Sequence, residues 1–179
     1  MRYLKLFLCM ILLLTGCSYK TLNEAIQKKW KVPVKIQYIE NKKQTVIFTD
    51  GTTDVQYVFS TFEKKHDRYI YSTDQEEGYT FDSDDGVPFL IRTINREKVG
   101  NIIWGALKTN KKVVRVNVVY TNKNNGDDQI EVQIPVKNNV FIGYPTRSFF
   151  DSETSLYQEW DLSAIAYDED GKVVANINY

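Results

Sequence analysis

Beyond residue 33, apolar and polar side chains alternate along most of the chain. A period of two residues is typical of strands that bury one face of a sheet. Valine, isoleucine and aromatic residues are frequent in these segments, and Gly, Asn and Asp separate them. The pattern predicts short strands at residues 34–40, 45–49, 55–62, 68–73, 89–94, 113–120, 129–136, 140–144, 160–167 and 172–177.

The clearest predicted pair of strands comprises residues 113–120 and 129–136. Alternate positions of both segments are apolar, and the polar residues 122–128 between them predict a turn. Turns that end in Asp-Gly at 50–51 and 168–171 predict further antiparallel hairpins. The shared apolar face of the clearest pair comprises Val114, Val116, Val118 and Tyr120 opposite Ile130, Val132, Ile134 and Val136.

One short helix is predicted before the strands. Thr21 and Glu24 match a capping box, in which the hydroxyl and the carboxylate bind backbone N–H groups at a helix start. Pro33 ends the helix near Val32, because the residue before a proline disfavours the helical conformation. Its apolar residues recur at helical spacing: Leu22, Ala25, Ile26 and Trp30. The expected fold is therefore mainly β (α+β with one short N-terminal helix), with antiparallel sheets.

The stretch 74–86 predicts a boundary between two halves. It contains six acidic residues, no basic residue and no periodic pattern. We expect a helix plus an antiparallel meander at residues 21–84 and a sandwich-like antiparallel half at residues 85–179. The two halves form either one domain with a shared core or two domains, and both readings stay open at this stage.

Residues 1–16 have the pattern of an export signal. Arg2 and Lys5 precede an apolar run at 6–14, and the small residues Thr15 and Gly16 follow. These nine apolar residues would extend about 14 Å as a helix, under half of a hydrocarbon core of about 30 Å. We therefore expect a signal peptide that is removed, and not a transmembrane span.

The residues that follow the leader add a second motif. The tetrapeptide 14–17 (LTGC) is similar to the lipobox of bacterial lipoproteins, in which two small residues precede the cysteine that is acylated. With this motif, the chain resembles the small uncharacterised surface lipoproteins of Gram-positive bacteria. The other stretches that carry the resemblance are 21–30 (TLNEAIQKKW), 101–118 (NIIWGALKTNKKVVRVNV) and 164–174 (AIAYDEDGKVV).

The resemblance implies location and anchoring. Cys17 would carry a diacylglyceryl group, and two acyl chains are enough for stable anchoring in a membrane. Residues 17–20 would then be the lipidated cysteine and a short tether at the extracytoplasmic face of the cell membrane. The chain's other cysteine, Cys9, lies in the leader, so we expect no disulfide within the mature chain.

Charge excludes one class of partner and suggests another. The chain has 23 basic and 23 acidic residues, so nothing in its total charge favours nucleic acid. Residues 20–43 contain seven lysines and two glutamates, whereas residues 151–171 contain seven acidic residues and no basic one. The membrane-proximal Lys28, Lys29 and Lys31 either bind anionic headgroups or wall polymers, or only keep the helix solvated.

Metal-site motifs are weak in this sequence. His66 is the single histidine and lies in a charged loop, so metal sites built on several histidines are excluded, and we expect a solvated side chain. Asp82, Asp84 and Asp85 form a weak candidate calcium loop. Its glycine, aligned to the sixth position of an EF-hand loop, places Phe81 at the first ligand position, so that motif fails. Residues 168–171 fail in the same way, and a hairpin turn is expected there.

We expect no enzymatic activity and no cofactor other than the lipid on Cys17. Glu153, Glu159 and Asp161 flank aromatic residues, but the separation that would mark a glycosidase pair is invisible in sequence.

The expected function is a protein-interaction module of the cell envelope, such as an accessory or immunity-type lipoprotein. It requires an exposed strand edge or apolar patch. The alternative is a wall-polymer or carbohydrate binding module, which requires exposed aromatic rings as stacking platforms. The candidate rings are Tyr69, Tyr71, Phe149, Phe150 and Trp160.

Overall fold

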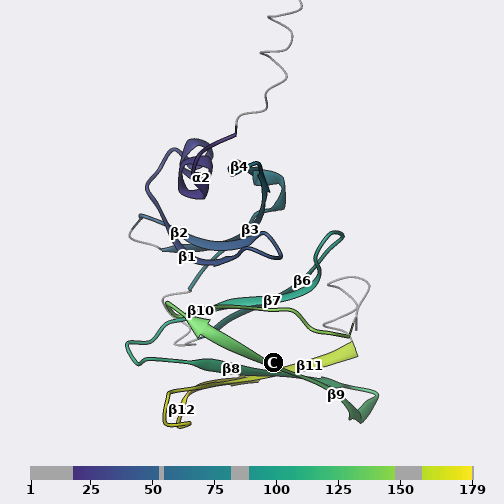
Figure 1. Ribbon diagram of the computed structural model, residues 1–179. Coiled ribbons are helices and arrows are strands. Elements are labelled where there is room, and N and C mark those ends of the chain that lie inside the picture. The colour runs from purple at the N-terminus through teal and green to yellow at the C-terminus, as the bar shows by residue number, and fades with distance from the viewer. Residues whose placement is uncertain (1–17, 53–54, 82–88, 148–158, 179) are drawn as a thin grey trace, which may run out of the picture. The chain divides into compact units, whose positions relative to one another are not determined.

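A computed structural model describes residues 18–52, 55–81, 89–147 and 159–178 (Figure 1). Strands form most of the described chain and pair in antiparallel sheets, which confirms the predicted fold class. The chain divides into two compact units, Met1–Gly78 and Tyr79–Tyr179. The predicted boundary between residues 84 and 85 lies outside the described residues.

The helix of the first unit, α2 (Leu22–Trp30), begins as its sequence predicts. The Thr21 Oγ1 accepts a hydrogen bond from the backbone N–H of Glu24, and the Glu24 carboxylate accepts one from the backbone N–H of Thr21, both at 3.2 Å. Lys31 caps the C-terminal end in the left-handed conformation, with φ of 58°, two residues before Pro33. The buried face of the helix comprises Leu22, Ala25 and Ile26.

A curled sheet of five strands forms the rest of the first unit, in the order β1-β2-β3-β4 with β5 paired to β3. β3 is long enough to pair with β2 through residues 57–61 and with β4 through residues 62–65. The sheet curls around α2 (Figure 1), and Val46, Phe48 and Val58 share a core with the helix. Its strands are β1 (Val34–Glu40), β2 (Thr45–Asp50), β3 (Gln56–Lys65), β4 (Arg68–Tyr71) and β5 (Glu77–Thr80).

The second unit is one antiparallel sheet that folds over on itself, in the order β12-β11-β8-β9-β10-β7-β6. β9 pairs with β8 as far as Pro135 and with β10 through Val136 and Lys137, so it passes from one layer to the other. Proline lacks a backbone N–H and fits the point where a strand changes partner. The strands are β6 (Phe89–Arg96), β7 (Gly100–Leu107), β8 (Arg115–Asn122), β9 (Asn125–Lys137), β10 (Val140–Gly143), β11 (Trp160–Tyr167) and β12 (Val173–Asn178).

One core fills the space between the two layers, which confirms the sandwich-like expectation for this half. Phe89 of β6 and Ile103 of β7 belong to the same buried cluster as Val118 of β8 and Trp160 of β11. The hydroxyls of Thr93 on β6 and Tyr120 on β8 also bond to each other inside this core. Because an unsatisfied buried hydroxyl is costly, this bond helps to fix how the layers stack.

The predicted strand pair forms with its apolar residues opposite each other, but its turn is shorter than expected. Val116 lies opposite Ile134, and Tyr120 lies opposite Ile130. The expected turn at 122–128 is wrong, because β9 already begins at Asn125, opposite Asn122. The polar residues there extend the hairpin beyond its apolar face, where both sides of a strand meet solvent.

Two strands were not predicted. β7 is buried at every position after Gly100, so its sequence lacks the alternation that marks a half-buried strand. β5 lies in the acidic stretch, where the pattern indicated a boundary and no strand.

Gly105 of β7 is required by a close approach between neighbouring strands. A Cβ at this position would lie 2.1 Å from the carbonyl oxygen of Leu90 and 2.5 Å from Cζ of Phe141. Phe141 is the cross-strand partner of Gly105, so its ring occupies the space that a side chain would need. Any other residue must push apart two paired strands.

We predict that Gly105→Ala lowers the free energy of unfolding by about 2 kcal/mol, the usual cost of overpacking a core. Gly126→Ala is the matched control, because no atom lies within 4 Å of a Cβ there. It should change stability by less than about 0.5 kcal/mol. Urea unfolding of the two purified variants measures both values, and equal stabilities would contradict the assignment.

Candidate functional site

The residues directly after Cys17 are bound to the edge strand β4. Tyr19 forms an antiparallel bridge with Tyr69, through two backbone hydrogen bonds of 2.8 Å. Arg68 donates from Nε to the Ser18 Oγ at 2.8 Å and from Nη2 to the Ser18 carbonyl at 2.6 Å. Within the expected tether at 17–20, Ser18 and Tyr19 therefore contact the first unit, and of these two residues Tyr19 forms a β-bridge.

The hairpin that joins β3 to β4 presents charged side chains beside Ser18. His66 and Asp67 form its turn with φ of 47° and 60°, and Lys65 lies opposite Arg68 in the register. His66 is exposed at this turn, as expected. We call Ser18–Lys20 together with residues 63–68 the anchor-side surface, after the lipid anchor that the sequence leads us to expect on Cys17.

Cations outnumber acids on the anchor-side surface. Lys20, Lys64, Lys65 and Arg68 are all exposed. Two acidic side chains partly offset them: Glu63 pairs with Lys65 at 2.7 Å, and Asp67 pairs with Lys64 at 3.4 Å. Exposed ion pairs of this kind contribute about 1 kcal/mol at most, so they hold the lysines only loosely. The lysines therefore stay available to another anion.

The lysines that the sequence analysis singled out lie elsewhere in the first unit. Lys28 and Lys29 occupy the last turn of α2, and Lys31 is its C-cap. All three are exposed. With a rise of about 1.5 Å per residue, Lys28 lies about 9 Å along the helix axis from Leu22, at the end away from Ser18. The hairpin cations were missed, because about fifty residues of sequence separate them from Cys17.

A polar cluster inside the first unit was also missed by sequence reasoning. Glu76 Oε1 accepts a hydrogen bond from the Trp30 indole Nε1 at 2.7 Å, and the Tyr71 hydroxyl donates to the same oxygen. This carboxylate joins the end of α2 to β4 and to the segment that leads into β5. Burial, followed by the nearby Glu76, raises the pKa of Tyr71 well above its usual value.

The calcium expectations have two outcomes. Asp82, Asp84 and Asp85 lie outside the described residues. The second acidic loop is the predicted hairpin turn, in which the Asp168 Oδ1 accepts backbone hydrogen bonds from Asp170 at 3.0 Å and Lys172 at 2.8 Å. Within the described part of the chain, no three His, Cys, Asp or Glu side chains are grouped as metal ligands.

The candidate stacking rings are not exposed where the structure describes them. Tyr71 is 4% exposed and Trp160 is 6% exposed. Tyr69 is half-buried, packs against the Phe62 ring at 5.8 Å and lies under Lys64. Phe149 and Phe150 lie outside the described residues. Tyr71 and Trp160 therefore do not meet the requirement of a carbohydrate-stacking surface, which is that its rings are exposed.

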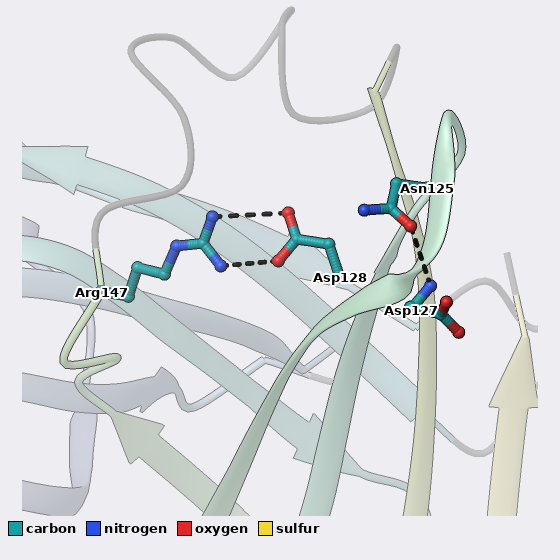
Figure 2. Close-up of polar contacts among 4 residues, drawn as sticks. All are labelled: Asn125, Asp127, Asp128 and Arg147. Carbon is teal, nitrogen blue, oxygen red and sulfur yellow. Dashed lines mark hydrogen bonds and ion pairs between the residues drawn. The ribbon is translucent and has the colours of Figure 1, made fainter.

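A polar contact in the second unit joins the β8–β9 hairpin to the segment after β10. The Arg147 guanidinium contacts both carboxylate oxygens of Asp128, at 2.7 and 3.4 Å (Figure 2). Arg147 holds the pKa of Asp128 below its usual value. Asn125 Oδ1 accepts from the backbone N–H of Asp127 at 3.3 Å in the same hairpin. The Arg147 guanidinium also lies 6.0 Å from the Trp160 ring centre.

Two of the three carboxylates considered for glycosidase chemistry lie among the described residues. Asp161 forms an ion pair with Lys123 at 3.5 Å, and Glu159 is exposed. Glu153 lies outside the described residues.

No protein-family model, curated protein or solved structure matches this chain. Function must therefore be argued from its own residues. Among the helices of the described residues, none is long and apolar enough to cross a membrane.

The raised pKa of Tyr71 predicts a pH dependence of stability. Above a pH of about 10, the usual value, the unfolded chain loses the phenol proton while the folded protein keeps it. The folded state then binds more protons, so the free energy of unfolding falls as pH rises, by up to about 1.4 kcal/mol per pH unit. The free energy of unfolding of Tyr71→Phe should fall less steeply between pH 9.5 and 11 than that of the unaltered protein. Urea unfolding at stepped pH measures both curves. Parallel curves would contradict the assignment.

Proposed function

We propose that this chain is a lipid-anchored, non-catalytic module at the extracytoplasmic face of the cell membrane, and that it binds another protein of the envelope. The anchor is a diacylglyceryl group on Cys17. The observation that carries the proposal is the placement of large exposed apolar side chains on strands at the ends of the two sheets.

The anchoring part is supported by the leader and by the bound residues that follow it. A cationic and then apolar segment ends at Leu14, and Cys17 follows two small residues. Ser18 and Tyr19 are already part of the folded unit, through Arg68 and Tyr69. A lipid on Cys17 would hold the β scaffold beside the membrane with almost no linker.

The protein-binding part is supported by two edge strands. In the described part of the chain, three large apolar side chains are exposed: Ile39, Val55 and Val173. Ile39 belongs to β1 and Val173, which is 57% exposed, to β12, and each strand ends the order of its sheet. An exposed edge can accept an extended segment of a partner as an added strand.

The two edges differ in how well they are protected against such pairing. Both edges have an irregular register, between Ile36 and Tyr38 on β1 and beside Val173 on β12, but β1 also carries the exposed Lys35, a charged side chain that discourages an added strand. β12 contains no charged side chain between Val173 and Asn178. We therefore assign the contact with an extended segment of the partner to β12.

Replacing Cys17 tests the anchor. Cys17→Ala removes the sulfur that takes the lipid, so metabolic labelling with a fatty-acid analogue should mark the unaltered protein and not the variant. Mass spectrometry of the N-terminal peptide should find a diacylglyceryl group on the unaltered protein and none on the variant. An unmodified Cys17 in membrane-associated protein would contradict the proposal.

Photo-crosslinking tests the β12 contact. A photoreactive amino acid at Val173 should yield one discrete adduct on intact cells, and the same group at the exposed Glu97 should not. Val173→Asp, with the probe moved to Asn176, should lower the yield about tenfold, the effect of about 1.4 kcal/mol on affinity. Equal labelling from Val173 and Glu97 would contradict the assignment.

A further inference from the structure

We propose that the anchor-side surface contacts the anionic phospholipid headgroups of the membrane that holds the chain. The inference rests on the proposed lipid anchor and adds an orientation to it. The occupant is the bilayer surface itself, and the contacting side chains are Lys20, Lys64, Lys65 and Arg68.

Covalent distance limits how far Cys17 can lie from the β3–β4 hairpin. The Cα atoms of neighbouring residues lie about 3.8 Å apart, so Cys17 follows Ser18 closely wherever it points. Ser18 is held by Arg68 through its hydroxyl and its carbonyl. The lipid on Cys17 would therefore emerge next to the β3–β4 hairpin.

The net charge of the anchor-side surface favours an anionic partner. Lys64 and Lys65 have exposed side chains, at 42% and 65%, and their partners are the exposed Asp67 and the half-buried Glu63. With Lys20 and Arg68, cations exceed acids by two over Ser18–Lys20 and residues 63–68. Cations within about 8 Å of an anionic membrane at physiological salt are attracted to its headgroups. The hairpin cations are the ones that the anchor brings into this range.

Two cations of the hairpin form an unfavourable pair that a bound anion would relieve. Lys65 lies directly opposite Arg68, and like charges in this position destabilise a pair of strands. Arg68 donates two N–H groups to Ser18, and its guanidinium has further N–H groups that can donate to an anion. A phosphate bridging the two cations would replace repulsion by two attractions.

The experiment uses the full chain, matured in bacterial membranes and reconstituted in vesicles. Acylation consumes the thiol of Cys17, so the cysteine of His66→Cys can carry a fluorophore. A second label, on Thr52→Cys, is the positional control, because the length of β3, up to about 30 Å, separates it from the hairpin. Nitroxide-labelled headgroups report proximity through quenching.

In vesicles with phosphatidylglycerol, we expect strong quenching at position 66 and little at position 52. In phosphatidylcholine alone, or at high salt, quenching at 66 should fall to the level at 52. Lys64→Gln with Lys65→Gln should weaken hairpin contact about 30-fold, the weight of two lysines at an anionic surface. The charge-matched control, Lys28→Gln with Lys29→Gln, should leave it unchanged.

The result separates this inference from the proposed function. Acylated protein with equal quenching at 66 and 52 would overturn the hairpin contact and leave the anchor intact. An equal loss of quenching at position 66 in both double-lysine variants would also overturn the hairpin contact, because the attraction to the membrane would then not be specific to the hairpin. Binding to purified wall sacculi without quenching on vesicles would assign the cations to a wall polymer. An unmodified Cys17 would overturn the anchor and, with it, this inference.

Discussion

Two backbone hydrogen bonds between Tyr19 and Tyr69 fix where the chain enters the folded protein. β4 is only four residues long, and Tyr19 covers part of its outer edge. Arg68 adds two side-chain bonds to Ser18 beside this bridge. The capped helix follows at once and packs into the concave face of the curled sheet. The edge of β4 could otherwise pair with another strand. Because Tyr19 binds it instead, the edge holds the entry point, the helix and the hairpin in fixed positions relative to one another.

The second unit depends on a different constraint, the passage of β9 between two layers. Pro135 ends the pairing with β8, and the next two residues pair with β10. This single strand lets one sheet form both faces of a sandwich, so one core can include residues from β6 and β11. The close approach at Gly105 lies within one layer, where the Leu90 carbonyl of β6 and the Phe141 ring of β10 leave no room for a Cβ on β7.

Local signals in the sequence predicted the elements whose chemistry is local. Thr21 and Glu24 marked the helix start, and the alternation through Val116 and Ile134 predicted that two strands pair through one apolar face. The extension of β3 to Lys65 was missed, because its charged residues indicated a loop and its turn uses His66 and Asp67 where glycine or asparagine is usual. The contacts of Ser18 with Arg68, and of Trp30 with Glu76, join residues about fifty positions apart, and nothing local in either segment indicates its partner.

The bound entry segment also has a mechanical consequence. A force applied to the chain at residue 17 reaches the Arg68 bonds to Ser18 first, the Tyr19 bridge next, and the helix cap at Thr21 only afterwards. The load is thus taken up in sequence order by three small sets of hydrogen bonds, each of which must open before the next is strained. The core of Leu22, Ile26 and Phe48 lies behind all of them, so tension would peel the entry segment away well before it unfolded the domain.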